Sequence, residues 1–254
     1  MSVIFEYAAF EKEMRAFALS ARATGSRPAG LEDTEGVEQA IRNLNAIATS
    51  NYTGLSSWTD SDWAPIRTAV SHGAFMPDSY GGRHVFARVT FLWGICNYGR
   101  QRQGKFRLFQ LVGNCSVRIY IHPEDAPNKV MAMWRFEVGA HDAPGCHFHA
   151  QILGDDNISD ELFPHALDVP RLPSFLITPT DAVEFVLGEL FQDDWRNRGT
   201  DGSAEVQNWK SHQQRRLTRI LEFQRDAIAN AVGSPWIALK NCKPKPNLVF
   251  DPRE

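Results

Sequence analysis

Apolar residues in the first part of the chain recur at helical spacing. They are separated by three or four positions, which places them on one face of a helix in each of three segments. The three predicted faces contain Phe10, Met14, Phe17 and Ala21; Val37, Ile41, Leu44 and Ile47; and Trp63, Ile66 and Val70. The segment GSRPAG ends the first helix, and Pro65 stands in the first turn of the third. Residues 1–76 are therefore predicted to be helical.

After residue 81 the pattern changes to aromatic and β-branched residues that alternate with polar ones. Five segments show this alternation: HVFARVTFLWGI, FRLFQLV, SVRIYIH, VMAMWRFEV and HFHAQIL. The connections between them are short and contain Gly, Asn, Asp and Pro. Short connections favour an antiparallel meander over a parallel sheet.

Helical periodicity returns in residues 178–235. Thr180 is placed to cap a helix DAVEFVLGELF, and a long helix follows in AEVQNWKSHQQRRLTRILEFQRDAIANAV. The basic residues of the long helix, Arg216 among them, suit a solvated face or a phosphate-binding stripe. We expect one α+β domain over residues 1–254, with the helical part at 1–76, a sheet of about five strands at 82–154, and C-terminal helices.

Composition narrows the possible classes of function. With 254 residues and 43% hydrophobic content, the chain can form a packed core. Its net charge of -3 and pI near 6.2 give no overall attraction to nucleic acid, so a polyanion must be held by a local basic patch. The four cysteines form no Cys-x-x-Cys pair, and no apolar run approaches the roughly 20 residues of a membrane span. A cytoplasmic protein with no membrane contact is expected.

The segments MAMWRFEV and HFHAQIL predict a β-hairpin with one polar face. Apolar residues occupy even positions in both segments, so matching the apolar faces pairs odd positions with odd positions. A loop centred near Asp142 then sets Glu137 opposite His147 and Arg135 opposite His149. The polar face gathers Arg135, Glu137, His147, His149 and Gln151.

This polar face suits cleavage of RNA without a metal or another cofactor. A glutamate and a histidine can act as general base and acid for attack by a ribose 2′-hydroxyl, while an arginine stabilises the phosphorane charge. In this interpretation Glu137 or His149 is the base, His147 is the acid, and Arg135 binds the phosphate. The residue set resembles that of the small microbial ribonucleases, which present Glu, Arg and His from an antiparallel sheet.

Other uses of the same face stay open. His147, His149 and Glu137 match the two-histidine, one-carboxylate set that binds iron or zinc, although the charge of Arg135 would repel a metal ion. The face also suits a non-catalytic surface that binds a nucleotide or a protein, or an ordinary solvated sheet face.

A second pair of residues points to the same chemistry. The stretch PIRTAVSHGAF contains Arg67 and His72 with four residues between them. It resembles the Arg-x(4 to 6)-His motif of HEPN ribonucleases, which implies RNA cleavage without metal at a homodimer interface. The sheet predicted downstream departs from the all-helical HEPN fold. His72, next to Gly73, is equally suited to end the third helix.

A longer and looser pattern runs from MWRFEV to VLGEL. It resembles uncharacterised bacterial toxin-like and phage-defence proteins through Arg135, Glu137, His147, His149 and the Arg-Leu-Pro turn at 171–173. The resemblance implies an antitoxin or a defence-system protein as a partner. We therefore expect a metal-independent endoribonuclease that acts on RNA in a toxin or antiviral-defence context.

Several common motifs do not occur in the sequence. It has no Gly-x-Gly-x-x-Gly, no Gly-x(4)-Gly-Lys-Ser/Thr, no His-Glu-x-x-His and no Gly-x-Ser-x-Gly segment, which disfavours dinucleotide enzymes, P-loop NTPases, zincins and α/β-hydrolases. Three aspartate pairs, at 60 and 62, 155 and 156, and 193 and 194, fall in predicted loops. Such residues can bind Mg²⁺, but they are also typical turn residues.

Overall fold

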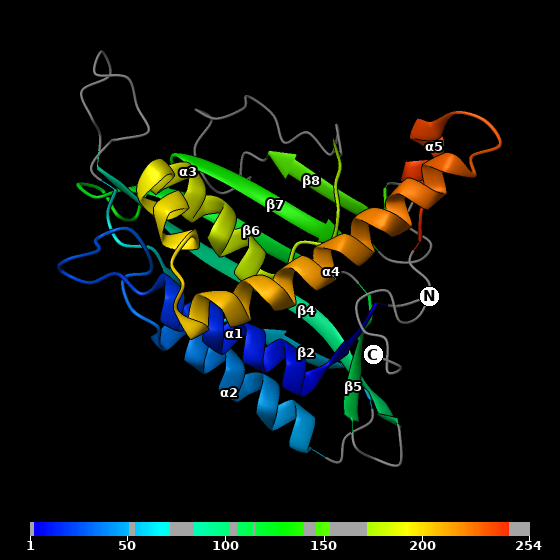
Figure 1. Cartoon of the computed structure of the whole chain (residues 1–254), viewed down its shortest axis with the longest axis horizontal. Coiled ribbons are helices and arrows are strands. Elements are labelled where there is room, and N and C mark those ends of the chain that lie inside the picture. The colour runs from blue at the N-terminus through cyan, green and yellow to red at the C-terminus, as the bar shows by residue number, and fades with distance from the viewer. Residues whose placement is uncertain are drawn as a thin grey trace.

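A computed structural model describes residues 3–50, 54–71, 84–101, 106–113, 115–139, 146–152 and 172–243 (Figure 1). The described helices are α1 (Tyr7–Ala21), α2 (Glu35–Thr49), α3 (Pro179–Gly199), α4 (Ala204–Ala229) and α5 (Pro235–Lys240). The described strands are β1 (Ile4–Glu6), β2 (Ser56–Thr59), β3 (Ile66–Arg67), β4 (Val85–Gln101), β5 (Phe106–Leu111), β6 (Cys115–Pro123), β7 (Ala132–Val138), β8 (Phe148–Ile152) and β9 (Leu172–Pro173). The predicted α+β class is confirmed, and the sheet is larger than the five predicted strands.

The sheet is antiparallel and is built around the long strand β4. Strand β4 pairs with β6 over Val85–Leu92 and with β5 over Ile95–Gln101. Strands β7, β8 and β9 continue from β6, so the chain forms a meander through β4, β6, β7 and β8. Strand β1 pairs with β5, while β2 and β3 pair with β4. The predicted antiparallel meander is therefore the centre of the sheet.

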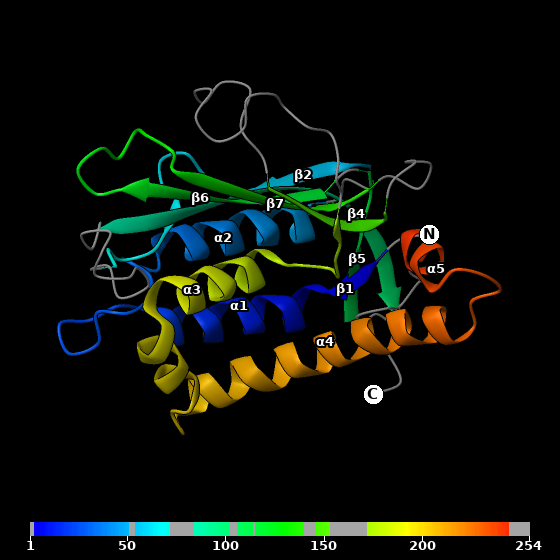
Figure 2. The same ribbon diagram turned by 90° about the horizontal axis from the view of Figure 1, so that it is seen from above.

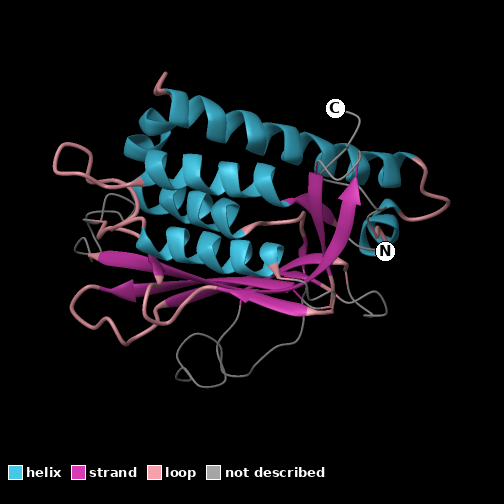
Figure 3. Ribbon diagram, turned by 90° about the horizontal axis from the view of Figure 1, so that it is seen from below, coloured by secondary structure: helices cyan, strands magenta, loops and turns pink. Residues whose placement is uncertain are grey.

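All the long helices lie on one side of the sheet. Figure 2 and Figure 3 show α1, α2 and α3 in a layer against the sheet, and α4 farther away, packed on α1. An aromatic core fills the interface between the layers, and Phe10 stacks on Trp93 with ring centroids 6.0 Å apart. None of the described helices has the length and apolarity that a membrane span needs. The opposite face of the sheet, here called the outer face, carries polar residues of the strands.

The third helix predicted around Trp63, Ile66 and Val70 is wrong. The short strands β2 and β3 lie in this region, and Ile66 pairs with Val89 of β4. Trp63 is 69% exposed, so the three residues do not form one buried stripe. Strand β4 is 17 residues long. Short strands beside β4 can bond the backbone N–H and C=O groups along its edge, whereas a helix at this place would leave those groups unpaired.

A buried ion cluster joins α1, α3 and α4. Arg216 of α4 contacts Glu13 of α1 and donates to both carboxylate oxygens of Asp181 at 2.8 and 2.9 Å. The predicted solvated or phosphate-binding role of Arg216 is wrong, because its side chain is buried. Asp181 also completes a capping box with Thr178, which is the N-cap of α3 in place of the predicted Thr180.

The pH dependence of stability should reveal this cluster. Burial raises the pKa of Glu13 to about 7, whereas a glutamate in an unfolded chain ionises near 4.5. A raised pKa in the folded state contributes stability that is present below pH 4.5 and is lost as the pH rises to about 7. Glu13→Gln removes this ionisation. The free energy of unfolding of the variant, relative to wild type, should therefore increase by on the order of 2 kcal/mol as the pH is raised from 5 to 8.

Denaturant titrations at the two pH values measure this gain in the free energy of unfolding. Glu222→Gln, at an exposed carboxyl of α4, is the control and should leave the pH dependence unchanged. Parallel pH dependences for wild type and Glu13→Gln would contradict the assignment.

Gly30 closes the turn that follows α1. Its φ is +151°, and a Cβ at this position would lie 2.1 Å from the Ala21 carbonyl oxygen, which accepts a hydrogen bond from Leu31. We expect Gly30→Ala to cost about 2 to 3 kcal/mol of stability in thermal or denaturant unfolding. Gly202→Ala is the matched control, because its added Cβ meets no atom within 4 Å. An equal effect of the two substitutions would refute the expected strain.

Candidate functional site

The β7–β8 pairing keeps the predicted faces but changes the predicted partners. Odd positions pair with odd positions, as predicted, and this part of the hairpin prediction is confirmed. Glu137 lies opposite His149, and Arg135 lies opposite Gln151, so the predicted pairs Glu137–His147 and Arg135–His149 are wrong. A shift of two residues leaves every side chain on its original face, so the apolar pattern alone does not distinguish the two registers.

Arg135, Glu137 and His149 form a contact cluster, here called the Arg–Glu–His cluster. One carboxylate oxygen of Glu137 contacts the Arg135 guanidinium, and the other lies 2.9 Å from His149 Nε2. The side chains of His149 and Glu137 are only 3% and 11% exposed. The cluster therefore combines an acid, an imidazole and a guanidinium in a largely desolvated position.

The hydrogen bonds define the charges in this cluster. Burial opposes ionisation of Glu137, but hydrogen bonds from His149 and Arg135 outweigh it and hold the pKa of Glu137 below its usual value. His149 Nδ1 lies 2.8 Å from the Cys146 carbonyl oxygen, which only accepts hydrogen bonds. With an ionised Glu137 at Nε2, both ring nitrogens of His149 face acceptors.

His147 lies next to the cluster in sequence but does not take its predicted place opposite Glu137. Its side chain is buried, its ring packs edge-on against Phe148 with centroids 4.9 Å apart, and its carbonyl accepts from Gly139 at 2.7 Å. The hydrogen bonds found for Glu137 go to Arg135 and His149.

Arg67 and His72 cannot be compared as a pair. His72 lies outside the described residues, as do Asp142, the aspartates at 155 and 156, and Arg171. Arg67 belongs to strand β3, where a helix was predicted, and its guanidinium carbon lies 3.8 Å from the centre of the Phe86 ring. Arg67 therefore belongs to the outer face of the sheet.

The alternative of a metal site finds no geometric support. Within the described ranges, no group of three or more His, Cys, Asp or Glu side chains is placed to hold a metal ion. His147, His149 and Glu137 are all described, so they do not form the predicted two-histidine, one-carboxylate set. Asp60 has a structural role, since its carboxylate accepts from the backbone N–H of Phe91 at 2.9 Å.

Four arginines lie on adjacent strands of the outer face. Arg67 of β3 pairs directly with Arg88 of β4, and Arg118 of β6 pairs directly with Arg135 of β7. Like charges at directly opposed positions of a sheet are destabilising. We call these four residues the arginine track. Two such pairs on one face indicate that the face is suited to an anionic partner.

The track leads to the Arg–Glu–His cluster. With strands about 4.8 Å apart and alternate residues about 6.6 Å apart, Arg67 and Arg135 are separated by roughly 16 Å along the sheet. Arg135 belongs both to the track and to the cluster. An extended polyanion that follows the track would therefore place a phosphate beside Glu137.

The arginines of the track are only partly neutralised. Arg67 pairs with Glu32 at 3.2 Å and Arg88 with Asp62 at 3.4 Å, and both arginine side chains are about one third exposed, at 35% and 36%. In the described part of the chain, Arg118 has a contact with the Tyr120 hydroxyl at 3.5 Å and no carboxylate partner. Arg88 and Arg118 were not among the residues predicted from the sequence. Their alternation within HVFARVTF and SVRIYIH marks them as polar-face residues, but their alignment with each other depends on the pairing of β4 and β6.

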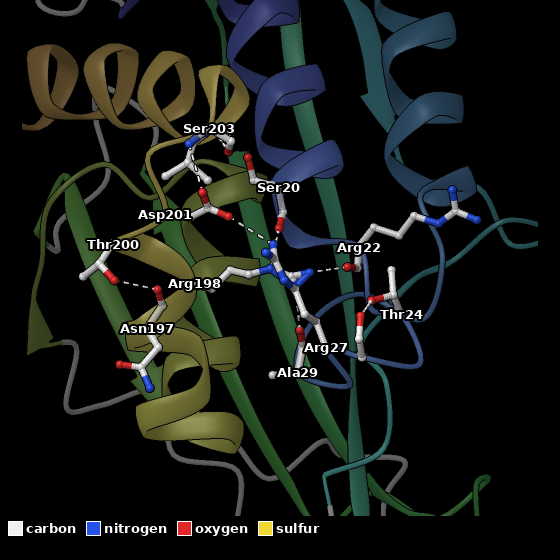
Figure 4. Close-up of polar contacts among 12 residues, drawn as sticks. Ser20, Arg22, Thr24, Arg27, Ala29, Asn197, Arg198, Thr200, Asp201 and Ser203 are labelled. Carbon is white, nitrogen blue, oxygen red and sulfur yellow. Dashed lines mark hydrogen bonds and ion pairs between the residues drawn. The ribbon is translucent and has the colours of Figure 1, made fainter.

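A different polar site lies at the end of α1, where a cavity of about 720 Å³ is lined by residues such as Arg27, Arg198 and Asp201. Figure 4 shows Arg198 of α3 pointing into the loop that follows α1. Its guanidinium donates to the carbonyl oxygens of Ser20, Arg22 and Ala29, which satisfies backbone acceptors at the helix end. Arg198 thus has a structural role, and this cavity is a weaker candidate than the outer face.

Comparisons with protein-family models, with curated proteins and with solved structures find no match to this chain.

Proposed function

We propose that the protein is a metal-independent endoribonuclease and that its active site is built on the Arg–Glu–His cluster. The observation that supports this proposal most strongly is the position of Glu137, held by Arg135 and His149, at the end of the arginine track. A carboxylate base beside a guanidinium is suited to phosphodiester chemistry, and the track supplies the local basic patch that a protein with a net charge of -3 needs.

The proposed reaction is an internal transfer within the RNA. Arg135 binds the scissile phosphate, and Glu137 takes the proton of the neighbouring 2′-hydroxyl. The 2′-oxygen forms a bond to phosphorus while the bond from phosphorus to the 5′-oxygen breaks, and an acid protonates that leaving oxygen. The products are a 2′,3′-cyclic phosphate and a 5′-hydroxyl end.

The positions of the two histidines suggest different roles. In-line displacement needs the base and the acid on opposite sides of the phosphate, whereas Glu137 and His149 are only 2.9 Å apart. His149 therefore acts as a positioning residue that orients the Glu137 carboxylate. We assign the acid to His147, which stands two residues before His149 at the bend that precedes strand β8.

Incubation of purified protein with mixed-sequence RNA in EDTA tests the proposal. Wild type should cleave the RNA, and His149→Ala should lose most of the activity. His212→Ala is a matched control, because His212 lies on α4 beyond the helical layer, and it should cleave like wild type. Absence of cleavage by wild type, or cleavage only with added divalent metal, would exclude this mechanism.

The proposed cellular context is a toxin or antiviral-defence system, with an antitoxin or another defence protein as partner. An unregulated endoribonuclease should arrest growth when it is expressed. The wild-type protein should therefore inhibit growth of a bacterial host, whereas a Glu137→Gln variant at the same level should not. Equal growth with both proteins would count against this context.

A further inference from the structure

A second group of residues lies on the outer face, away from the Arg–Glu–His cluster. Phe86 of β4 pairs directly with His122 of β6, and their rings stack with centroids 5.2 Å apart at an angle of 13°. The Arg67 guanidinium covers the Phe86 ring, and Arg67 lies directly opposite Arg88 in the pairing of β3 with β4. The group therefore combines stacked flat groups with two cations.

Three nitrogens in this group are buried without a hydrogen-bond partner in the described part of the protein. They are Arg67 Nε and Arg88 Nε, which are donors, and His122 Nε2. Arg67 Nε lies 3.2 Å from a carboxylate oxygen of Glu32, which leaves Arg88 Nε and His122 Nε2 for a ligand. His122 Nδ1 lies 3.0 Å from the Lys129 carbonyl oxygen, so it carries the proton that forms this bond. Burial, together with the charges of Arg88 and Arg67, lowers the pKa of His122, although hydrogen bonds to the carbonyls of Lys129 and Pro127 act in the opposite direction. A neutral His122 with its proton on Nδ1 presents Nε2 as an acceptor.

An acceptor and a donor beside a stack of flat groups match the edge of a nucleobase. Each nucleobase has N–H donors next to oxygen or nitrogen acceptors, and proteins that recognise unpaired bases combine hydrogen bonds to this edge with stacking on aromatic rings or guanidinium planes. In a duplex the same edges are occupied by base pairing, and the bases are stacked on each other. The chemistry of the group thus favours an unpaired base.

The group and the cluster lie on the same face at a distance that RNA can span. His122 is six residues along β6 from Ser116, which pairs with Glu137, and this separation corresponds to about 20 Å. Arg118 lies between them on β6 and can contact a phosphate of a connecting strand. The two places can therefore bind different nucleotides of one RNA molecule.

We propose that Arg67, Phe86, Arg88 and His122 form a base-binding subsite that selects single-stranded RNA over duplex RNA. The proposal rests on the proposed function in that it takes RNA as the ligand of the outer face. The unpaired base stacks against the group, His122 Nε2 accepts from an N–H of the base, and Arg88 donates to a neighbouring acceptor.

Equilibrium binding of a labelled 2′-O-methyl RNA tests the subsite without cleavage. The probe is used as a single strand and as a duplex with its complement, and binding is measured by fluorescence anisotropy. Wild type should bind the single strand more tightly. His122→Ala should weaken single-strand binding about 5- to 100-fold, as expected when one stacked base is lost. Duplex binding should change less than 2-fold, and His212→Ala should leave both affinities unchanged.

A second variant separates loss of RNA binding from loss of the fold. His122→Phe preserves a flat ring beside Phe86 but removes the acceptor, so its single-strand affinity should lie between those of wild type and His122→Ala. Thermal unfolding identifies a variant that has lost its fold, and a variant of that kind is replaced by Arg88→Gln in the same assay.

The results separate this inference from the proposed activity. Tight, His122-dependent binding of the single strand supports the subsite even when native RNA is not cleaved, in which case the nuclease proposal alone fails. Cleavage of native RNA together with equal binding of single strand and duplex, or with wild-type binding by His122→Ala, would overturn the subsite.

Discussion

Glu137→Gln should reduce the rate of RNA cleavage about 100- to 10,000-fold, which is the usual range for loss of a general base. Glutamine is similar in size to glutamate and keeps an oxygen that accepts a hydrogen bond from Arg135 or His149, but it cannot take the 2′-hydroxyl proton. The affinity for RNA should fall little, because the arginine track is intact. Single-turnover cleavage assays at saturating protein concentration, combined with binding of an uncleavable RNA, separate the two effects.

The pH profile adds a check on the same residue. The pKa of Glu137 lies below its usual value of 4.5, so the carboxylate stays ionised as the pH falls from neutral to about that value. Protonation of Glu137 should therefore lower the cleavage rate of wild type only when the pH falls below the usual glutamate range. Retention of more than one tenth of the wild-type rate by Glu137→Gln would remove this carboxylate from the mechanism.

Arg135→Lys should reduce the cleavage rate about 100- to 1,000-fold, comparable with the loss of one donor that stabilises a transition-state oxyanion. Lysine keeps the positive charge but loses the planar pair of donors that binds a phosphate and a carboxylate together. The contact with Glu137 would lose its geometry as well. We expect a decrease in kcat much larger than the change in KM, measured on a short RNA with one cleavage site.

Arg118→Ala provides the contrast to Arg135→Lys. Arg118 lies directly opposite Arg135 on the track but makes no described contact with Glu137. This substitution should weaken RNA binding and reduce the slope of log affinity against log salt by about 0.7, with little change in kcat. Arg225→Ala, on the exposed surface of α4, is the charge-matched control. If Arg118→Ala and Arg135→Lys had the same effect on kcat, the separation of track and cluster would be wrong.

The apolar pattern predicted the parts of the fold whose periodicity is long and regular. Phe10, Met14 and Phe17 are buried on one face of α1, and the alternation in SVRIYIH corresponds to strand β6, where buried and partly exposed residues alternate. The region around Trp63 and Ile66 was mispredicted because three apolar residues at helical spacing also fit short strands. The unpaired edge of β4 favours strands over a helix, but the local sequence around Trp63 and Ile66 carries no information about that edge.

The candidate site was predictable in its residue types and its face but not in its contacts. Even apolar positions placed Arg135, Glu137 and His149 on one surface, whereas the register depends on the length of the connection between β7 and β8. A shift of two residues exchanged His147 for His149 as the partner of Glu137. The arginine track needed the pairing of four strands, which are separated by up to 68 positions in the chain between Arg67 and Arg135.

The chemical nature of the cleavage products tests the central claim most directly. An RNA with a single 2′-deoxy substitution at the cleaved position and its unmodified counterpart are incubated with the protein in EDTA, and the products are identified by mass spectrometry. The account predicts fragments with 2′,3′-cyclic phosphate and 5′-hydroxyl ends from the unmodified RNA, and no cleavage next to the deoxy position. Fragments with 3′-hydroxyl and 5′-phosphate ends, or cleavage of the deoxy-substituted RNA at that position, would contradict attack by the 2′-hydroxyl and the role of Glu137 as its base.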